Sequence, residues 1–246
     1  YKAKPEKTVH EKLADDAVAR YEGNTNFMET VPLHIEKGIT FALTQIQEKN
    51  LSNLDPGTEP AYHNLDHTIG VMDRYNRIME KIQAADIDSV SQHEHEIGFL
   101  YGAFHDIDQS FDESEGKRNR RVGDIETYSM QMLQVYMEME NEEARKKSQP
   151  EPYTENDISQ ATEIMSTVAT LSEEKNVHQP SLNSGSSVTE IALALSDLGE
   201  AGMEKPETFI KGAKALFREE NMAFSRKVES DYQFSEEEKT RAMVKM

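Results

Sequence analysis

The sequence predicts an all-α protein, on the basis of its composition, its apolar periodicity and the absence of strand-like segments. Residues that favour helices are plentiful (Ala, Glu, Lys, Met and Leu), whereas Val, Ile and aromatic residues are sparse. Apolar side chains recur every three or four residues, as in amphipathic helices. No segment predicts a strand, and no linker is long enough to divide the 246 residues. We therefore expect a single helical domain over residues 1–246, with its core at about 33–228.

The first half of the chain predicts four helices. Regularly spaced apolar residues mark the first three: Leu13, Ala17 and Tyr21 in 8–21; Ile35, Ile39, Leu43 and Ile46 in 33–49; and Leu65, Ile69, Met72, Ile78 and Ile82 in 65–84. Turn-forming residues separate the second from the third at 53–57. The fourth, over 91–105, is almost wholly apolar in its second half and is expected to be buried. Its Gly98 and Gly102 would let another helix approach closely.

The second half predicts a polar connection followed by further helices. Residues 107–121 are polar and end in a dense basic cluster, Lys117-Arg118-Asn119-Arg120-Arg121. A long helix then runs from about Ile125 to a Pro-containing loop at 146–152. The next helix, capped by Thr154 or Asn156, is expected to continue to Leu171. After a polar loop at 174–187, the apolar stripe resumes over 188–198, and further helices fit 206–217, 219–228 and 235–244.

Charge and cysteine content narrow the class of function. The net charge is −19, which disfavours binding to a nucleic-acid polymer or to an anionic membrane. No Cys is present, so disulfides, thiolate metal sites and Cys nucleophiles are excluded. No apolar run approaches the roughly 20 residues of a membrane span. The chain begins at Tyr1 rather than Met, which indicates that an upstream segment was removed, and we expect a cytoplasmic protein. The oligomeric state stays open, with a homodimer as one option.

Imidazoles and carboxylates stand beside the apolar helical segments at three places. His63 and His67 share one side if both are helical; alternatively, Asn64 caps the helix and His63 sits just outside it. His105 and Asp106 are adjacent, so they can reach one ion only near a helix end. Asp197 lies in an apolar stripe, where a carboxylate needs a divalent cation, an Arg or a helix N-terminus as a partner. This inventory predicts a site for Mn, Fe, Co, Ni or Zn, with Mg less suited.

The order of these residues resembles the HD-domain superfamily of metal-dependent phosphohydrolases. The series His67, His105-Asp106 and Asp197 carries the resemblance, and the segment Tyr62-His63-Asn64-Leu65-Asp66-His67 is similar to the opening motif of one predicted branch. Four further segments of that branch have counterparts here: Phe104-His105-Asp106-Ile107, Glu126 with Ser129, Ser196-Asp197-Leu198-Gly199, and Phe217-Arg218-Glu219-Glu220 with Phe224 and Arg226. The resemblance covers roughly Ile35 to Val228 and implies a single HD-domain-like helical bundle.

The resemblance also implies roles for single residues. Four side chains would hold one divalent ion: His67, His105, Asp106 and Asp197. His63 would protonate the leaving oxygen and Glu126 would orient water, while Arg218 and Arg121 would bind phosphate. Dinuclear members of the superfamily carry extra histidines before the final Asp, and only His178 lies in that interval, so one ion is expected. Structural roles are the alternatives: a loop hydrogen bond for His63, an ion pair for Glu126 and a solvated loop for the basic cluster.

The function that these expectations favour is hydrolysis of a small phosphoester, with a nucleotide as the first substrate class, through a metal-activated water. Two alternatives belong to other classes. One is a non-catalytic HD module that holds metal or a nucleotide and signals to a partner. The other is a di-iron oxygenase, which the short supply of histidines argues against.

Overall fold

The structure, a computed structural model, describes residues 31–52, 60–85, 90–109, 112–114, 117–119, 121–171 and 176–221. Within these ranges the fold is all-α, as the sequence predicts. The helices expected at 8–21 and 235–244 lie outside the described residues, as do residues 222–228 of the expected core.

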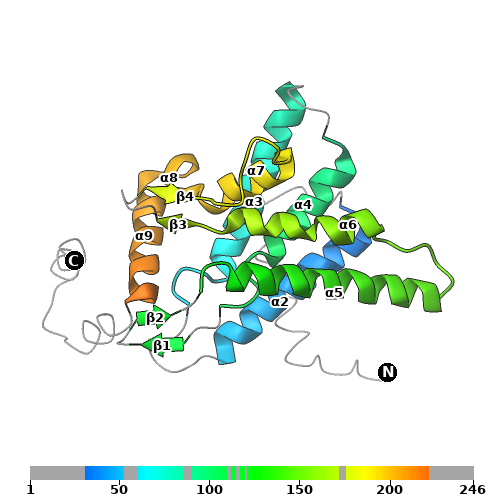
Figure 1. Cartoon of the computed structure of the whole chain (residues 1–246), viewed down its shortest axis with the longest axis horizontal. Coiled ribbons are helices and arrows are strands. Elements are labelled where there is room, and N and C mark those ends of the chain that lie inside the picture. Colours follow the sequence, from blue (N-terminus) through cyan, green and yellow to red (C-terminus); the bar gives the residue numbers. More distant parts are fainter. Residues whose placement is uncertain are drawn as a thin grey trace, which may run out of the picture.

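Four long helices build the bundle, and their bounds agree with the sequence to within a few residues. They are α2 (Leu33–Ser52), α3 (Leu65–Ala85), α4 (Gln92–Phe104) and α5 (Asp124–Lys146). Figure 1 shows α5 along one flank, with α6 (Glu155–Gln160) folded back over it. No described helix is long and apolar enough to cross a membrane.

Helix α4 is the centre of the core. Ser91 and Glu94 form a capping box that starts it, and from His95 to Phe104 every residue is buried. It contacts α2, α3, α5 and α7 (Val188–Asp197). Gly98 allows the closest approach, because a Cβ there would overlap the Tyr75 hydroxyl and lie 2.6 Å from Thr189 Cγ2. The expected close approach is thus confirmed at Gly98, and α3 and α7 are the helices that approach.

The prediction that the chain has no strands was wrong. Strand β1 (Asp112–Ser114) pairs antiparallel with β2 (Lys117–Asn119), within the connection expected to be irregular. A second pair joins β3 (Thr170–Leu171) to β4 (Val177–His178). Strands of two or three residues show no alternating pattern in the sequence, because they are too short to bury one face. Figure 1 shows both pairs at the end of the molecule where α9 (Pro206–Glu220) stands.

Three helical segments also differ from the prediction. The helix capped by Thr154 ends at Gln160 and tightens into the 3₁₀ helix η2 (Ala161–Thr167), so it stops well short of Leu171. Thr167 Oγ1 donates to the Ile164 carbonyl at 2.9 Å, a local bond that competes with the α-helical ladder. A short helix, α8 (Glu200–Met203), was not predicted, and α9 continues through the break expected after Phe217.

Candidate metal centre

His67 and His63 take up the second of the two arrangements expected for them. The Asn64 side chain accepts from the backbone amides of Asp66 and His67, at 3.0 and 3.2 Å, so it caps α3. His67 therefore lies in the first turn of α3, and His63 lies just outside the helix. The cap fixes the backbone that carries His67 and aims its ring across the bundle.

His105 and Asp106 lie just past the end of α4, as the sequence predicts for two neighbours that face one ion. The helix ends at Phe104, and the Ile107 amide donates to the Phe104 carbonyl at 3.0 Å as the chain turns away. From α5, Ser129 Oγ donates to the His105 carbonyl at 2.8 Å. The turn and this bond together hold the two side chains on one side of the chain.

The side chains of His67, His105, Asp106 and Asp197 converge on one point. His67 Nε2 lies 3.3 Å from Asp106 Oδ2 and 3.2 Å from Asp197 Oδ1. His105 Nε2 lies 3.1 Å from Asp106 Oδ2 and 3.6 Å from Asp197 Oδ1. The two Nε2 atoms are 3.3 Å apart. Helices α3 and α7 and the turn that follows α4 thus bring together four donor atoms from distant parts of the sequence.

The hydrogen bonding of His105 shows which of its nitrogens can bind a cation. Its Nδ1 lies 2.7 Å from the Gly102 carbonyl oxygen, which can only accept, so Nδ1 carries the proton. In the neutral ring, Nε2 then presents a lone pair to the cluster. Asp106 Oδ2 is buried without a hydrogen-bond partner. Several lone pairs therefore face one another in a buried space, an arrangement that is stable only with a positive charge among them.

The electrostatics of the cluster favour that positive charge. Burial lowers the pKa of His67 and of His105, but Asp106 and Asp197 outweigh burial, and both pKa values are raised. Burial raises the pKa of each carboxyl, but the nearby histidines outweigh it and both carboxyl pKa values are lowered. Two carboxylates stay ionised here, so the site attracts either protons on its histidines or a divalent cation.

The two histidine nitrogens are spaced from each other, from Asp106 Oδ2 and from Asp197 Oδ1 like ligands around one transition-metal ion. At bond lengths of about 2.0–2.2 Å, neighbouring ligands are roughly 3–3.5 Å apart. The measured separations run from 3.1 to 3.6 Å. One ligand atom from each of His67, His105 and Asp106 lies within a sphere that suits an ion. Imidazole with carboxylate suits Zn, Mn, Fe, Co or Ni, so these residues fit the metal that the sequence predicts.

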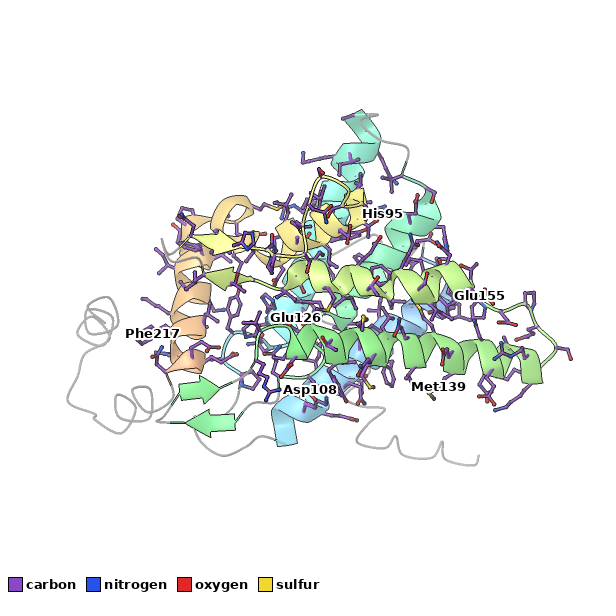
Figure 2. The ribbon with its side chains drawn as sticks, in the orientation of Figure 1. His95, Asp108, Glu126, Met139, Glu155 and Phe217 are labelled. Carbon is purple, nitrogen blue, oxygen red and sulfur yellow. The ribbon has the colours of Figure 1, made fainter. Side chains whose placement is uncertain are left out.

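A cavity of about 300 Å³, the site cavity, opens beside the two carboxylates. Its lining includes Asp106 and Asp197 together with three residues predicted for the reaction: His63, Glu126 and Arg121. Figure 2 shows Glu126 on the first turn of α5, at the end nearest the hairpins. Arg218 is half-buried in the last turn of α9 and is not part of this lining. Of the two arginines predicted to bind phosphate, Arg121 is thus the one placed at the site cavity.

Glu219 is the residue of this region to which the sequence reasoning gave no role. It is buried in the last turn of α9, and its Oε1 lies 2.6 Å from His63 Nδ1. Its Oε2 accepts from the backbone amides of Tyr62 and His63, at 2.8 and 3.1 Å. The carboxylate accepts, so Nδ1 of His63 carries the proton and Nε2 is left for other chemistry. The only signal in the sequence was the Phe217-Arg218-Glu219-Glu220 segment, which contains two adjacent glutamates and does not indicate which of them is buried.

His178 lies away from the cluster, exposed on β4, so it adds no ligand. Comparison with protein-family models, with curated proteins and with solved structures found no match for this chain.

Proposed function

We propose that this chain is a metal-dependent hydrolase of small phosphoesters, with nucleotides as the first substrate class to test. The convergence of His67, His105, Asp106 and Asp197 beside a cavity that also holds His63 and Arg121 supports the proposal most directly. A metal with no adjoining cavity would suit a structural role, whereas an ion beside a cavity of this size suits a small substrate.

The four ligands would hold one divalent ion. Such an ion supplies Lewis-acid chemistry: it makes bound water more acidic and offsets the charge of a phosphate oxygen. His178 is exposed on β4 and adds no ligand for a second ion. We therefore expect one ion per chain.

Residues of the site cavity supply the rest of the reaction. Arg121 pairs with phosphate oxygens and orients phosphorus toward the carboxylates. Glu126 accepts a hydrogen bond from the attacking water, aligns it, and takes the proton that the water loses as it attacks, which then passes to solvent. As the new P–O bond forms and the ester P–O bond breaks, His63 gives the proton on Nε2 to the leaving oxygen. The products are an alcohol and a phosphate, and His63 is reprotonated from solvent.

The test is turnover of generic phosphomonoester and phosphodiester substrates, then of a nucleotide panel, with Mn, Co, Ni or Zn added in turn. The doubly substituted His105→Ala, Asp106→Ala protein should lose its metal-dependent turnover. His178→Ala is the matched control, since it removes an exposed imidazole and should change nothing. Turnover that survives the double substitution would defeat the proposal. Tight metal or nucleotide binding without turnover would instead favour the non-catalytic module.

A further inference from the structure

Arg74 is a buried charged side chain that the proposed reaction does not use. It lies on α3, and only 2% of its surface is exposed. Its Nη2 is buried without a hydrogen-bond partner, and the nearest carboxylate oxygen to Nη1, Glu204 Oε1, is 4.0 Å away. A buried guanidinium with so little compensation costs stability, so its presence calls for another explanation.

The strong contact of Arg74 is with the peptide that carries Asp197. Its Nε donates to the Ser196 carbonyl oxygen at 2.6 Å. That carbonyl, one of the last in α7, also accepts from the Gly199 amide at 3.3 Å, so Arg74 and the turn after α7 share one acceptor. Because the Ser196 carbonyl and the Asp197 amide share one peptide plane, the bond restricts the direction in which the Asp197 side chain leaves the helix.

The turn after α7, at Leu198 and Gly199, packs closely against the same Arg74 side chain. A Cβ at Gly199 would lie 2.6 Å from Arg74 Cδ and 2.9 Å from Arg74 Nε. Gly199 has φ −66, which any residue can adopt, so glycine is required here by the close approach of Arg74 and of the Leu195 carbonyl oxygen, which would lie 2.9 Å from the same Cβ. The side chain thus passes directly over the two-residue turn that follows Asp197.

Arg74 also stands in register with His67. The two residues are seven apart on α3, so they project from nearly the same face of that helix. One helix therefore carries a metal ligand and, two turns further on, the donor that holds the segment of a second ligand.

We propose that Arg74 is a positioning residue for the metal centre: through the Ser196 carbonyl it holds Asp197 at the spacing from His67 that a shared ion requires. The inference rests on the proposed metal centre. Partners that orient metal ligands in this way typically change metal affinity by about 10- to 100-fold when they are removed.

Arg77 provides the matched control. It lies one turn beyond Arg74 on α3. It donates to Glu204 Oε1 at 3.2 Å and to the Met203 carbonyl at 3.5 Å, at the end of α8. Neither of these hydrogen bonds involves the Ser196 peptide. Arg77→Met should therefore disturb the end of α8 without moving Asp197, whereas Arg74→Met removes the donor to Ser196 at similar volume.

The experiment measures Mn and Zn affinity by competition with a chromophoric chelator, together with unfolding in urea. Wild type and Arg77→Met should bind metal alike, and Arg74→Met should bind at least about 10-fold more weakly while still folded. Gly199→Ala, which keeps every donor but pushes on Arg74 and on the Leu195 carbonyl of α7, should weaken binding in the same direction; it serves if Arg74→Met does not fold. Equal affinity in Arg74→Met and Arg77→Met, or unchanged affinity in Gly199→Ala when Arg74→Met is unfolded, would overturn the role of Arg74. A wild type that binds no metal would overturn the metal centre itself.

Discussion

At the scale of single residues, the contact between His63 and Glu219 separates proton transfer from metal binding. His63 is half-buried, lines the site cavity and is not among the four converging donors. Its Nδ1 is engaged by Glu219, so the ring is held in one orientation. A histidine held in this way can serve as a general acid, and its loss should affect turnover alone.

We expect His63→Ala to lower kcat by about 100-fold or more, because general acids of this kind contribute roughly 10²–10⁴. The metal content should stay at the wild-type value. The defect should shrink for a p-nitrophenyl ester, whose leaving group needs no proton. Steady-state kinetics with both ester types and elemental analysis check these points. Loss of the ion together with activity would show that His63 is a ligand instead.

Glu163, which lies on η2, is expected to make the free energy of unfolding depend on pH. Burial raises the pKa of Glu163 to about 7, although Ser187 Oγ donates to it at 3.0 Å and lowers it, while Glu190 and Glu94 raise it further. Below its ordinary pKa of 4.5 the group is protonated in folded and unfolded chains alike. As pH rises from there to about 7, the unfolded chain releases this proton first, so the folded state loses stability.

Glu163→Gln should therefore be more stable than wild type by about 1 kcal/mol at pH 8, with the gain shrinking toward pH 5. The full shift would correspond to about 3 kcal/mol, and partial exposure of Glu163 to solvent reduces it. Urea unfolding at both pH values measures the difference. Glu138→Gln, an exposed substitution on α5, is the control and should show no such trend. A Gln variant that gains nothing at pH 8 would contradict the raised pKa.

At the scale of elements, the start of α3 is set by one side chain. Asn64 accepts from two amides of the first turn and donates to the Ala61 carbonyl at 3.0 Å. Asn64→Ala should lower the free energy of unfolding by about 1 kcal/mol, and Asn64→Asp should retain most of it, because aspartate also caps. Urea denaturation of the two variants decides, and equal losses in both would show that the amide bond to Ala61, rather than the cap, is what matters.

The elements also show where sequence reasoning works and where it fails. Long amphipathic helices such as α2, α3 and α5 were predicted because each buries one apolar stripe, which leaves a periodic pattern. The hairpins were missed because their two or three residues pair with near neighbours and leave no pattern. The end of α6 was misplaced for a related reason: apolar spacing continues into η2 although the backbone tightens there. Local hydrogen bonds, rather than burial, decide such boundaries.

The candidate site could be anticipated in its ligands but not in its supports. His67, His105, Asp106 and Asp197 stood out because charged or titratable groups within apolar segments need a partner. Glu219 and Arg74 did not, because acids and arginines are common on helices and only the folded chain shows that these two are buried. Contacts across 122 and 156 residues follow from tertiary packing, which no local pattern records.

At the scale of the whole molecule, the centre ties together three helices that enter it from different parts of the chain. An ion bound only by the folded state should therefore raise the free energy of unfolding of the whole bundle. The gain is about 2.7 kcal/mol when the ion is present at 100 times its Kd. We expect chelator-treated protein to melt at a higher temperature on addition of Mn or Zn. The variant with both His105→Ala and Asp106→Ala should show no such rise, and His178→Ala should behave as wild type. An equal rise in all three proteins would mean that the ion binds elsewhere.

Because Glu219 holds the His63 ring, a C-terminal truncation that removes Glu219 should affect catalysis before it affects the candidate metal ligands. A shortened or protease-trimmed form ending before residue 219 would keep every candidate ligand and would still take up metal. It would lack the acid that joins the last helix to the Tyr62-His63 segment, 156 residues away. Under the proposed function, we expect such a form to bind its ion without catalysing the reaction.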